Sequence, residues 1–272
     1  MKYLLRSPLS RVGLVILLLV ILVAIFAPVL APHDPLQVDL PNRLKPPSRE
    51  HLLGTDEMGR DILSRIIYGA RISLSISVRV IIVTFPFGAL VGAIAGFYGG
   101  WLDETLMRLT DVFLSIPGLI LALAISASLG PSLNNAMIAL AIIWWPWYAR
   151  VTRAVVLQVR EMEYVEAARA EGLPSLAILF KHVLPNSLAP AMVNASLDLG
   201  FVILNAAGLS FVGLGAQPPT PEWGAMLSTA REFLRDAWWA TTFPGLAILV
   251  TVLAFNLLGD GFRDMMDPKM RR

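Results

Sequence analysis

Cysteine is absent from this chain of 272 residues, and charged side chains make up only 15% of it. Without cysteine the protein has no disulfide and no thiolate-bound metal, although this absence does not assign a compartment. A phosphate-binding loop of the form GxxxxGK[ST] is also missing, so the chain does not bind ATP by that route. The formal net charge of +2 provides no basic surface of the kind that binds nucleic acid.

Apolar residues make up 56% of the chain, and the mean hydropathy is +0.66. These values predict an all-α protein that crosses a lipid bilayer several times. We expect six spans, two of them within residues 112–148 and separated by a turn at 130–135. The first apolar stretch, residues 13–30, could also be a secretory signal, but it is long for one and no small-residue cleavage site follows it. The other spans cover residues 72–97, 188–211 and 240–258.

The expected spans divide the chain into four parts. The first loop is rich in proline and ends in an amphipathic helix that should lie at the membrane surface. The core contains five spans, a short polar link at 98–111 and a longer polar loop at 150–187. The parts are residues 1–30 (tail and first span), 31–71 (extracytoplasmic loop with the interfacial helix), 72–260 (transmembrane core) and 261–272 (charged tail).

The longer polar loop contains a segment, Tyr164–Pro185, whose sequence predicts two helices joined by a break. Alanines favour a helix before Gly172, which suits a helix end with positive φ. Pro174 fits the first turn of the second helix, and Pro185 should end the helical pattern. Because this charged segment lies between apolar stretches of membrane length, it must lie in water.

The order Glu-Ala-Ala, then Gly172, then Leu-Pro resembles the EAA loop of permease subunits of ATP-binding-cassette importers. The segment from Gly54 to Asp61 and the run from Ala207 to Leu227 resemble the dipeptide, oligopeptide and nickel branch of that family, and the chain looks like its shorter, second permease. The family often has a glutamate where this chain has Ala206. The resemblance assigns the contact with the ATPase to Tyr164, Glu166, Ala167, Ala168, Gly172, Leu184 and Pro185.

The resemblance implies a type I importer fold, with a cytoplasmic coupling helix formed by the EAA loop. It implies a heterodimer with a second permease paralogue, two ABC ATPase subunits and an extracytoplasmic solute-binding protein. ATP and Mg²⁺ would be bound by the ATPases, with no cofactor in this chain. The expected location is the cytoplasmic (inner) membrane of a bacterium or archaeon, with both termini in the cytoplasm. Peptides are the leading substrate class, and a nickel chelate or oligosaccharides are the alternatives.

Few ionisable residues lie within the predicted spans. Asp198 is near the middle of the fifth span, where it must face protein or water. It either lines the solute route or pairs with another helix, and Asn194 and Asn205 are near enough in sequence to satisfy it. Arg79 is expected near the start of the second span, with its side chain reaching the interface.

No catalytic residue and no metal site is expected. His33 and His51 lie in the outer loop, where lone histidines are usually solvated, and the acids near Gly54 lack the spacing of a calcium loop. A membrane enzyme would need paired carboxylates, a histidine cluster or a serine-based dyad at membrane depth. An ion-driven secondary transporter, the alternative from another class, would need paired ionisable groups in broken helices and an inverted repeat. The sequence offers neither pattern.

Overall fold

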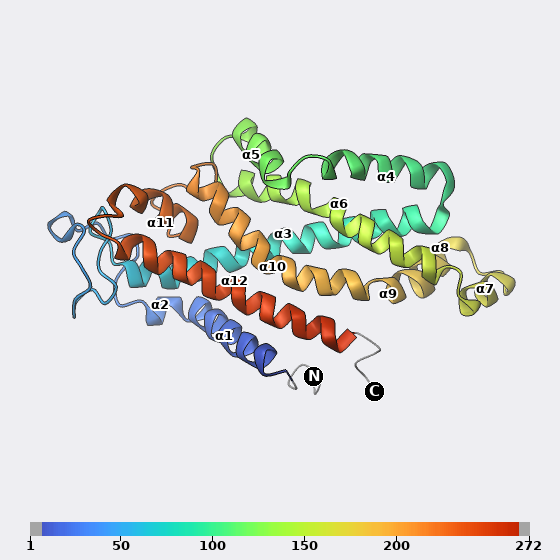
Figure 1. Cartoon of the computed structure of the whole chain (residues 1–272), viewed down its shortest axis with the longest axis horizontal. Helices are drawn as coiled ribbons and strands as arrows, with labels where there is room; N and C mark the ends of the chain where they lie inside the picture. Colours follow the sequence, from blue (N-terminus) through green and yellow to red (C-terminus); the bar gives the residue numbers. More distant parts are fainter. Residues whose placement is uncertain (1–6, 267–272) are drawn as a thin grey trace.

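The computed structural model describes residues 7–266, and this part of the chain is built of helices with one isolated β-bridge between Thr55 and Asp61 (Figure 1). The basic residues Lys2 and Arg6, and residues 267–272 of the predicted tail, lie outside the described residues. The elements in chain order are α1 (Pro8–Ile25), α2 (Ala27–Leu30), η1 (Leu40–Asn42), α3 (Ile62–Tyr98), α4 (Gly100–Leu114), α5 (Gly118–Leu129), α6 (Leu133–Val159), α7 (Glu163–Ala170), α8 (Ser175–Ile178), η2 (Leu179–Val183), α9 (Leu184–Ser187), α10 (Ala189–Phe211), α11 (Trp223–Ala230), η3 (Arg231–Phe233) and α12 (Trp239–Met266).

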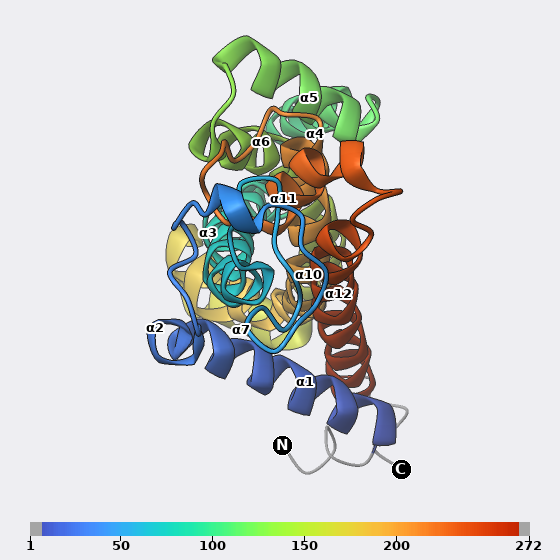
Figure 2. The same ribbon diagram turned by 90° about the vertical axis from the view of Figure 1, so that its left-hand side faces the viewer.

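The long helices α3, α6, α10 and α12 run along the length of the molecule (Figure 1). Short elements gather at its two ends. One end carries the loop of residues 31–61 and α11, and the other carries α7, α8 and α9. Figure 2 shows α1 at one edge of the molecule and α4 with α5 at the opposite edge. This arrangement separates two polar ends by a bundle of apolar helices.

Four of the described helices are long and apolar enough to cross a membrane: α1, α3, α10 and α12. The pair α4 and α5 would make a fifth span if the two helices are taken together, but they are bent by 85° at the break between them. Helix α6, which contains the predicted fourth span, is not among these helices. The structure therefore shows an all-helical protein with several apolar spans.

The predicted interfacial helix is not a separate element. Residues 62–71 are the first turns of α3, which continues without a break for 37 residues. Asp61 caps this helix, because its side chain accepts a hydrogen bond from Ser64 N at 2.8 Å. Ile62 and Ala70 are buried in protein instead of lying on the bilayer surface. The helix begins earlier than predicted because its first polar residues find partners inside the protein.

The predicted polar link at 98–111 is also wrong, since most of it is helix α4. Gly99 and Gly100 reverse the chain after α3, both with positive φ. The polar side chains of α4 then pair with α6: Asp103 Oδ2 lies 2.6 Å from Arg153 Nη2, and Asp111 pairs with Arg150. The predicted span that begins at residue 112 is consequently divided by the bend before α5.

Helices α3 and α6 pack most closely of any pair. Gly88, Gly92 and Gly96 recur every four residues along α3 and face α6. A Cβ atom at Gly92 would overlap the backbone carbonyl oxygen of Ala149. Small residues at such a crossing let two backbones approach without a side chain between them, which stabilises helix pairs in a membrane.

Candidate functional site

Residues 162–187, here called the tip, form the end of the molecule opposite the 31–61 loop (Figure 1). Helix α7 starts with the acidic residues Glu163 and Glu166 and ends with Arg169, an arrangement that complements the helix dipole. Val165 and Ala168 are buried, whereas Glu166 and Ala167 are exposed. Helix α7 thus turns one face to the protein and presents the Glu-Ala pair to its surroundings.

Gly172 ends α7 with a φ of 79°, as its position predicts. Leu173 N donates to Ala168 O at 3.2 Å, and Gly172 N donates to Arg169 O at 3.0 Å. These two bonds form a Schellman motif, in which the left-handed residue is normally glycine. The apolar contact that often accompanies the motif is present too, because Leu173 packs against the cluster that contains Ala168. The break between the two predicted helices is therefore a tightly bonded turn.

The second half of the tip is more helical than predicted. Pro174 is the N-cap of α8 and not part of its first turn. The chain then widens into a π-helical turn, η2, in which Leu184 N donates to Leu179 O. Pro185 does not end the pattern, since it lies inside α9. The wide turn provides room for the proline ring, which would clash with a carbonyl in a regular helix.

The underside of the tip is fixed to the ends of two spans by a hydrophobic cluster. Val165 of α7 and Val183 of η2 are fully buried in it, together with Phe97 of α3 and Val156 of α6. The guanidinium of Arg169 lies 5.9 Å from the centre of the Phe97 ring. A close-packed cluster of this kind transmits displacement with little compression. The tip is therefore packed directly against the ends of α3 and α6.

The outer surface of the tip is unusually apolar for a polar segment. Tyr164, Leu176 and Phe180 are 40%, 61% and 48% exposed. Tyr164 Oη reaches the carbonyl of His182 at 3.4 Å, which is a weak restraint. Exposed large apolar residues among charged ones are typical of protein contact surfaces. Glu166, Ala167 and Gly172 lie on this surface, whereas Ala168 and Leu184 belong to the cluster beneath it.

Asp198 of α10 pairs with a residue that the sequence did not indicate. Tyr148 Oη of α6 donates to Asp198 Oδ2 at 2.6 Å, and Tyr148 is fully buried. Asn205 instead donates to Phe201 O of its own helix. No hydrogen bond within the described part of the chain joins Asn194 or Asn205 to Asp198. The pair therefore connects two of the long helices near the middle of each.

We expect Tyr148→Phe to destabilise the protein by about 1–3 kcal/mol, because the half-buried Asp198 loses the hydrogen bond that Tyr148 donates. Asp198→Asn keeps an acceptor oxygen and should cost less and leave transport largely intact. Thermal unfolding in detergent measures the stability of both variants, and Asn205→Ala on the same helix as Asp198 is the control. Loss of transport in Asp198→Asn at unchanged stability would assign Asp198 to the solute route instead.

Arg79 lies near the middle of α3, because this helix begins at Ile62. It is exposed on the isolated chain, beside the exposed residues Val78, Ile82 and Val83. The interfacial position expected for its side chain stays a prediction.

Buried ion pairs and hydrogen bonds stabilise the opposite end of the molecule, and their partners were not predicted from local sequence patterns. Arg60 binds Asp56 and Glu57, each at 2.7 Å, and Arg65 donates to the carbonyls of Pro35 and Pro219 at 2.9 and 3.2 Å. Burial, followed by the neighbouring Asp56, raises the pKa of the Glu57 carboxyl. These contacts join the 31–61 loop, the start of α3 and the loop before α11.

Glu222 caps α11 within the run from Ala207 to Leu227 that carries part of the family resemblance. Its carboxylate accepts from Gly224 N at 3.0 Å and from Ala225 N at 2.9 Å. Burial raises the pKa of Glu222, and these two hydrogen bonds act in the opposite direction. The loop in this run is limited to residues 212–222.

His33 and His51 were expected to be solvated, and for His51 this is wrong. His51 is 8% exposed, and its Nδ1 lies 3.0 Å from Asp61 Oδ1. His33 is half-buried, and the centroids of the two histidine rings are 4.8 Å apart. Residues from three separate places in the sequence therefore meet at the start of α3.

Two families of known proteins match the chain. Residues 88–272 match the family described as binding-protein-dependent transport system inner membrane component. Residues 1–47 match the N-terminal transmembrane domain of oligopeptide transport permease C.

Curated relatives cover almost the whole chain. The dipeptide transport system permease protein of Alkalihalophilus pseudofirmus is 49% identical over 99% of this chain and 89% of its own length. The probable D,D-dipeptide transport system permease protein of Escherichia coli is 48% identical over 97% of this chain and 88% of its own.

Among solved structures, a chain of the inward-facing MetNI methionine ABC transporter has a similar fold. The TM-score is 0.61 at 20% sequence identity, and the match covers 76% of this chain and 98% of that one. This likeness concerns the fold alone.

Proposed function

This chain belongs to the family of binding-protein-dependent transport system inner membrane components, and we propose that it forms half of the pathway by which an ABC importer takes up dipeptides and short oligopeptides. Relatives at 45–49% identity are named for dipeptide or tripeptide transport. The observation that supports the coupling role is the tip, whose outer side exposes large apolar residues and whose inner side packs against α3 and α6.

The tip is proposed to dock into an ATPase subunit. Its apolar residues Tyr164, Leu176 and Phe180 would enter the contact, and Glu166 would offer a charge to a basic partner. Two such ATPases would bind ATP together with Mg²⁺ and hydrolyse the ATP, and this chain would carry out no catalytic step itself. Movement of the docked tip would move α3 and α6 with it and switch the pathway between its inward-open and outward-open states.

Six spans are proposed, with α6 and the α4–α5 pair added to the four helices that qualify alone. The start of α1 and the end of α12 both point toward the half of the molecule that carries the tip, which supports two termini on the cytoplasmic side (Figure 1). The 31–61 loop then faces outward, where an extracytoplasmic solute-binding protein would deliver the peptide. The membrane is proposed to be the inner membrane of a bacterium or archaeon.

The exposed Arg79 supports a second permease chain. A charged side chain at mid-helix, surrounded by exposed valine and isoleucine, is unfavourable against lipid. A paralogous permease that covers this face would place Arg79 in a protein interface or a water-filled pathway. We therefore propose a heterodimer in which α3 lies at or near the contact between the two permeases.

Reconstituted vesicles test the proposed function. The complex of both permeases and both ATPases should accumulate a labelled dipeptide only when its binding protein is outside and ATP is inside. Uptake that persists without ATP and collapses with the ion gradient would establish an ion-driven transporter instead. Preferential uptake of a nickel chelate or an oligosaccharide by the same vesicles would keep the mechanism and overturn the peptide assignment.

A further inference from the structure

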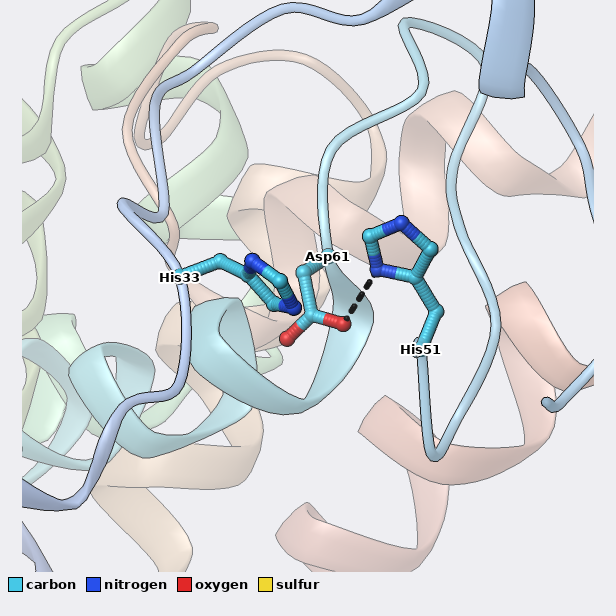
Figure 3. Close-up of side chains that lie close together, drawn as sticks. All are labelled: His33, His51 and Asp61. Atoms are coloured by element: carbon cyan, nitrogen blue, oxygen red, sulfur yellow. Dashed lines mark hydrogen bonds and ion pairs between the residues drawn. The ribbon is translucent and has the colours of Figure 1, made fainter. Parts of the chain in front are cut away.

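A group of three metal-ligating side chains lies at the end of the molecule opposite the tip, and the proposed transport function does not use it. One ring nitrogen each of His33 and His51 and a carboxylate oxygen of Asp61 lie within 4.8 Å of one another. Figure 3 shows the three side chains pointing toward a common space from two stretches of the loop and the start of α3. We propose that they bind a divalent first-row transition-metal ion such as Zn²⁺.

The burial of the three residues suits a metal site with access from solvent. Asp61 and His51 are 2% and 8% exposed, so their donor atoms face little competition from water. His33 is half-buried and borders the outside. An ion can therefore enter on the His33 side, and a water molecule can complete the coordination, as it does in zinc sites with three protein ligands.

Ser64 organises the group from behind. Its hydroxyl donates to Asp61 Oδ2 at 2.7 Å and accepts from the backbone N of His33 at 3.0 Å. Asp61 Oδ2 also accepts from Ser64 N, so the carboxylate is held by one oxygen while Oδ1 faces the histidines. Hydrogen bonds that orient ligands in this way are the usual support of metal sites in proteins.

The histidine rings are held as well. His33 Nε2 donates to the carbonyl oxygen of Glu50 at 3.0 Å in the absence of an ion, so this ring either binds the ion through Nδ1 or gives up this hydrogen bond to bind it through Nε2. His51 Nδ1 donates to Asp61 Oδ1 in the absence of an ion. When an ion binds, the proton of His51 moves to Nε2, which lies on the side of the ring away from Asp61 (Figure 3).

The distances are close to those of a bound ion. Donor atoms on a tetrahedral Zn²⁺ are about 3.4 Å apart, given bonds of about 2.1 Å. The His51–Asp61 distance of 3.0 Å already falls near this value, and a movement of up to about 1.4 Å by the less buried His33, from 4.8 Å to about 3.4 Å, would complete the set. Two imidazoles and one carboxylate favour zinc, nickel, copper or cobalt over calcium or magnesium, which prefer oxygen ligands alone.

A bound ion would join the loop of residues 31–61 to the first turn of α3. His33 and His51 are separated by a proline-rich stretch without a long helix, so cross-linking them to Asp61 would reduce the freedom of that loop. The ion would thus stabilise the outward-facing end of the protein.

The test is zinc binding to the purified full-length chain in detergent, with an affinity tag that contains no histidine. Wild type should bind one Zn²⁺ per chain, measured by competition with a chromophoric chelator, and Zn²⁺ should raise its unfolding temperature. His33→Ala and His51→Ala should each weaken binding at least about tenfold and remove the shift in unfolding temperature.

His182→Ala is the matched control, since it removes the chain's third histidine from the tip. It should bind Zn²⁺ as wild type does. Equal affinity in wild type and His33→Ala would overturn the proposal and leave the group as a hydrogen-bonded pair with a neighbouring ring. Because His33 is half-buried, its substitution should leave the fold intact. If His51→Ala fails to fold, the zinc affinity of His33→Ala alone tests the proposed site. None of these measurements depends on peptide uptake.

Discussion

Replacing Glu166 with Arg is expected to reduce ATP-dependent peptide uptake by the assembled transporter at least about 30-fold, on the premise that a desolvated charge contact at an interface contributes about 2–5 kcal/mol. Glu166 lies on the exposed face of α7, opposite the buried Val165 and Ala168. Its replacement should leave insertion and folding unchanged. The measurement is the rate of peptide uptake into vesicles by the variant and by wild type, with the amount of each subunit determined in the same samples.

The matched control is Glu104→Arg, the same change on an exposed residue of α4. Among the residues that the structure describes, Glu104 forms its ion pair with Arg108, and such exposed pairs contribute at most about 1 kcal/mol. Uptake should therefore fall little. If Glu166→Arg transported as well as Glu104→Arg, the proposed docking of the tip would be refuted.

Gly172→Val should also abolish uptake, in this case because it changes the backbone conformation between α7 and α8. No atom lies within 4 Å of the Cβ position at Gly172, so the substitution causes no clash, but its φ of 79° is unfavourable for a β-branched residue. Gly172→Asn tolerates this φ and should retain most of the uptake. A Val variant as active as the Asn variant would show that the angle between α7 and α8 does not matter for coupling.

Replacing Gly92 with Ala is expected to lower the unfolding temperature of the permease by about 6–12 °C, which corresponds to about 3 kcal/mol for a chain of this size. The added methyl group would overlap the carbonyl oxygen of Ala149, and neither backbone can move aside without separating α3 from α6. Thermal unfolding in detergent measures the change.

Gly208→Ala on α10 serves as the control for Gly92→Ala. A Cβ atom there meets no neighbour within 4 Å, and the residue lies inside a helix, where alanine is more favourable than glycine by up to about 1 kcal/mol. Its unfolding temperature should stay the same or rise. Equal losses in both variants would mean that glycine content, and not the close approach of α3 and α6, determines stability.

Local patterns predicted the parts of the fold that depend on neighbouring residues. The helix before Gly172, the turn at that glycine and four of the apolar spans required only composition, helix propensity and the conformational freedom of glycine. The family resemblance pointed to the same segment, because all residues of the EAA motif lie within one continuous stretch of sequence. The contact role of the individual tip residues stays a prediction.

Features that depend on distant partners could not be predicted in this way. Helix α4 was interpreted as a link because Asp103 and Asp111 are charged, yet their partners Arg153 and Arg150 lie on α6. The acidic residues and arginines at the start of α3 led to the prediction of a helix on the membrane surface. In the structure these side chains are buried inside the protein, which the neighbouring residues in the sequence do not indicate. The bond from Tyr148 to Asp198 joins residues that are 50 positions apart.

The uninterrupted length of α3 has a consequence for communication across the bilayer. A helix of 37 residues is about 55 Å long, whereas the hydrocarbon layer is about 30 Å thick. Its first turn therefore contacts the 31–61 loop through Asp61, while its last turns contact the tip through Phe97. A load applied to the 31–61 loop would reach the tip along one continuous helix, and Pro86, which removes a backbone hydrogen bond inside α3, is the point at which that helix can bend.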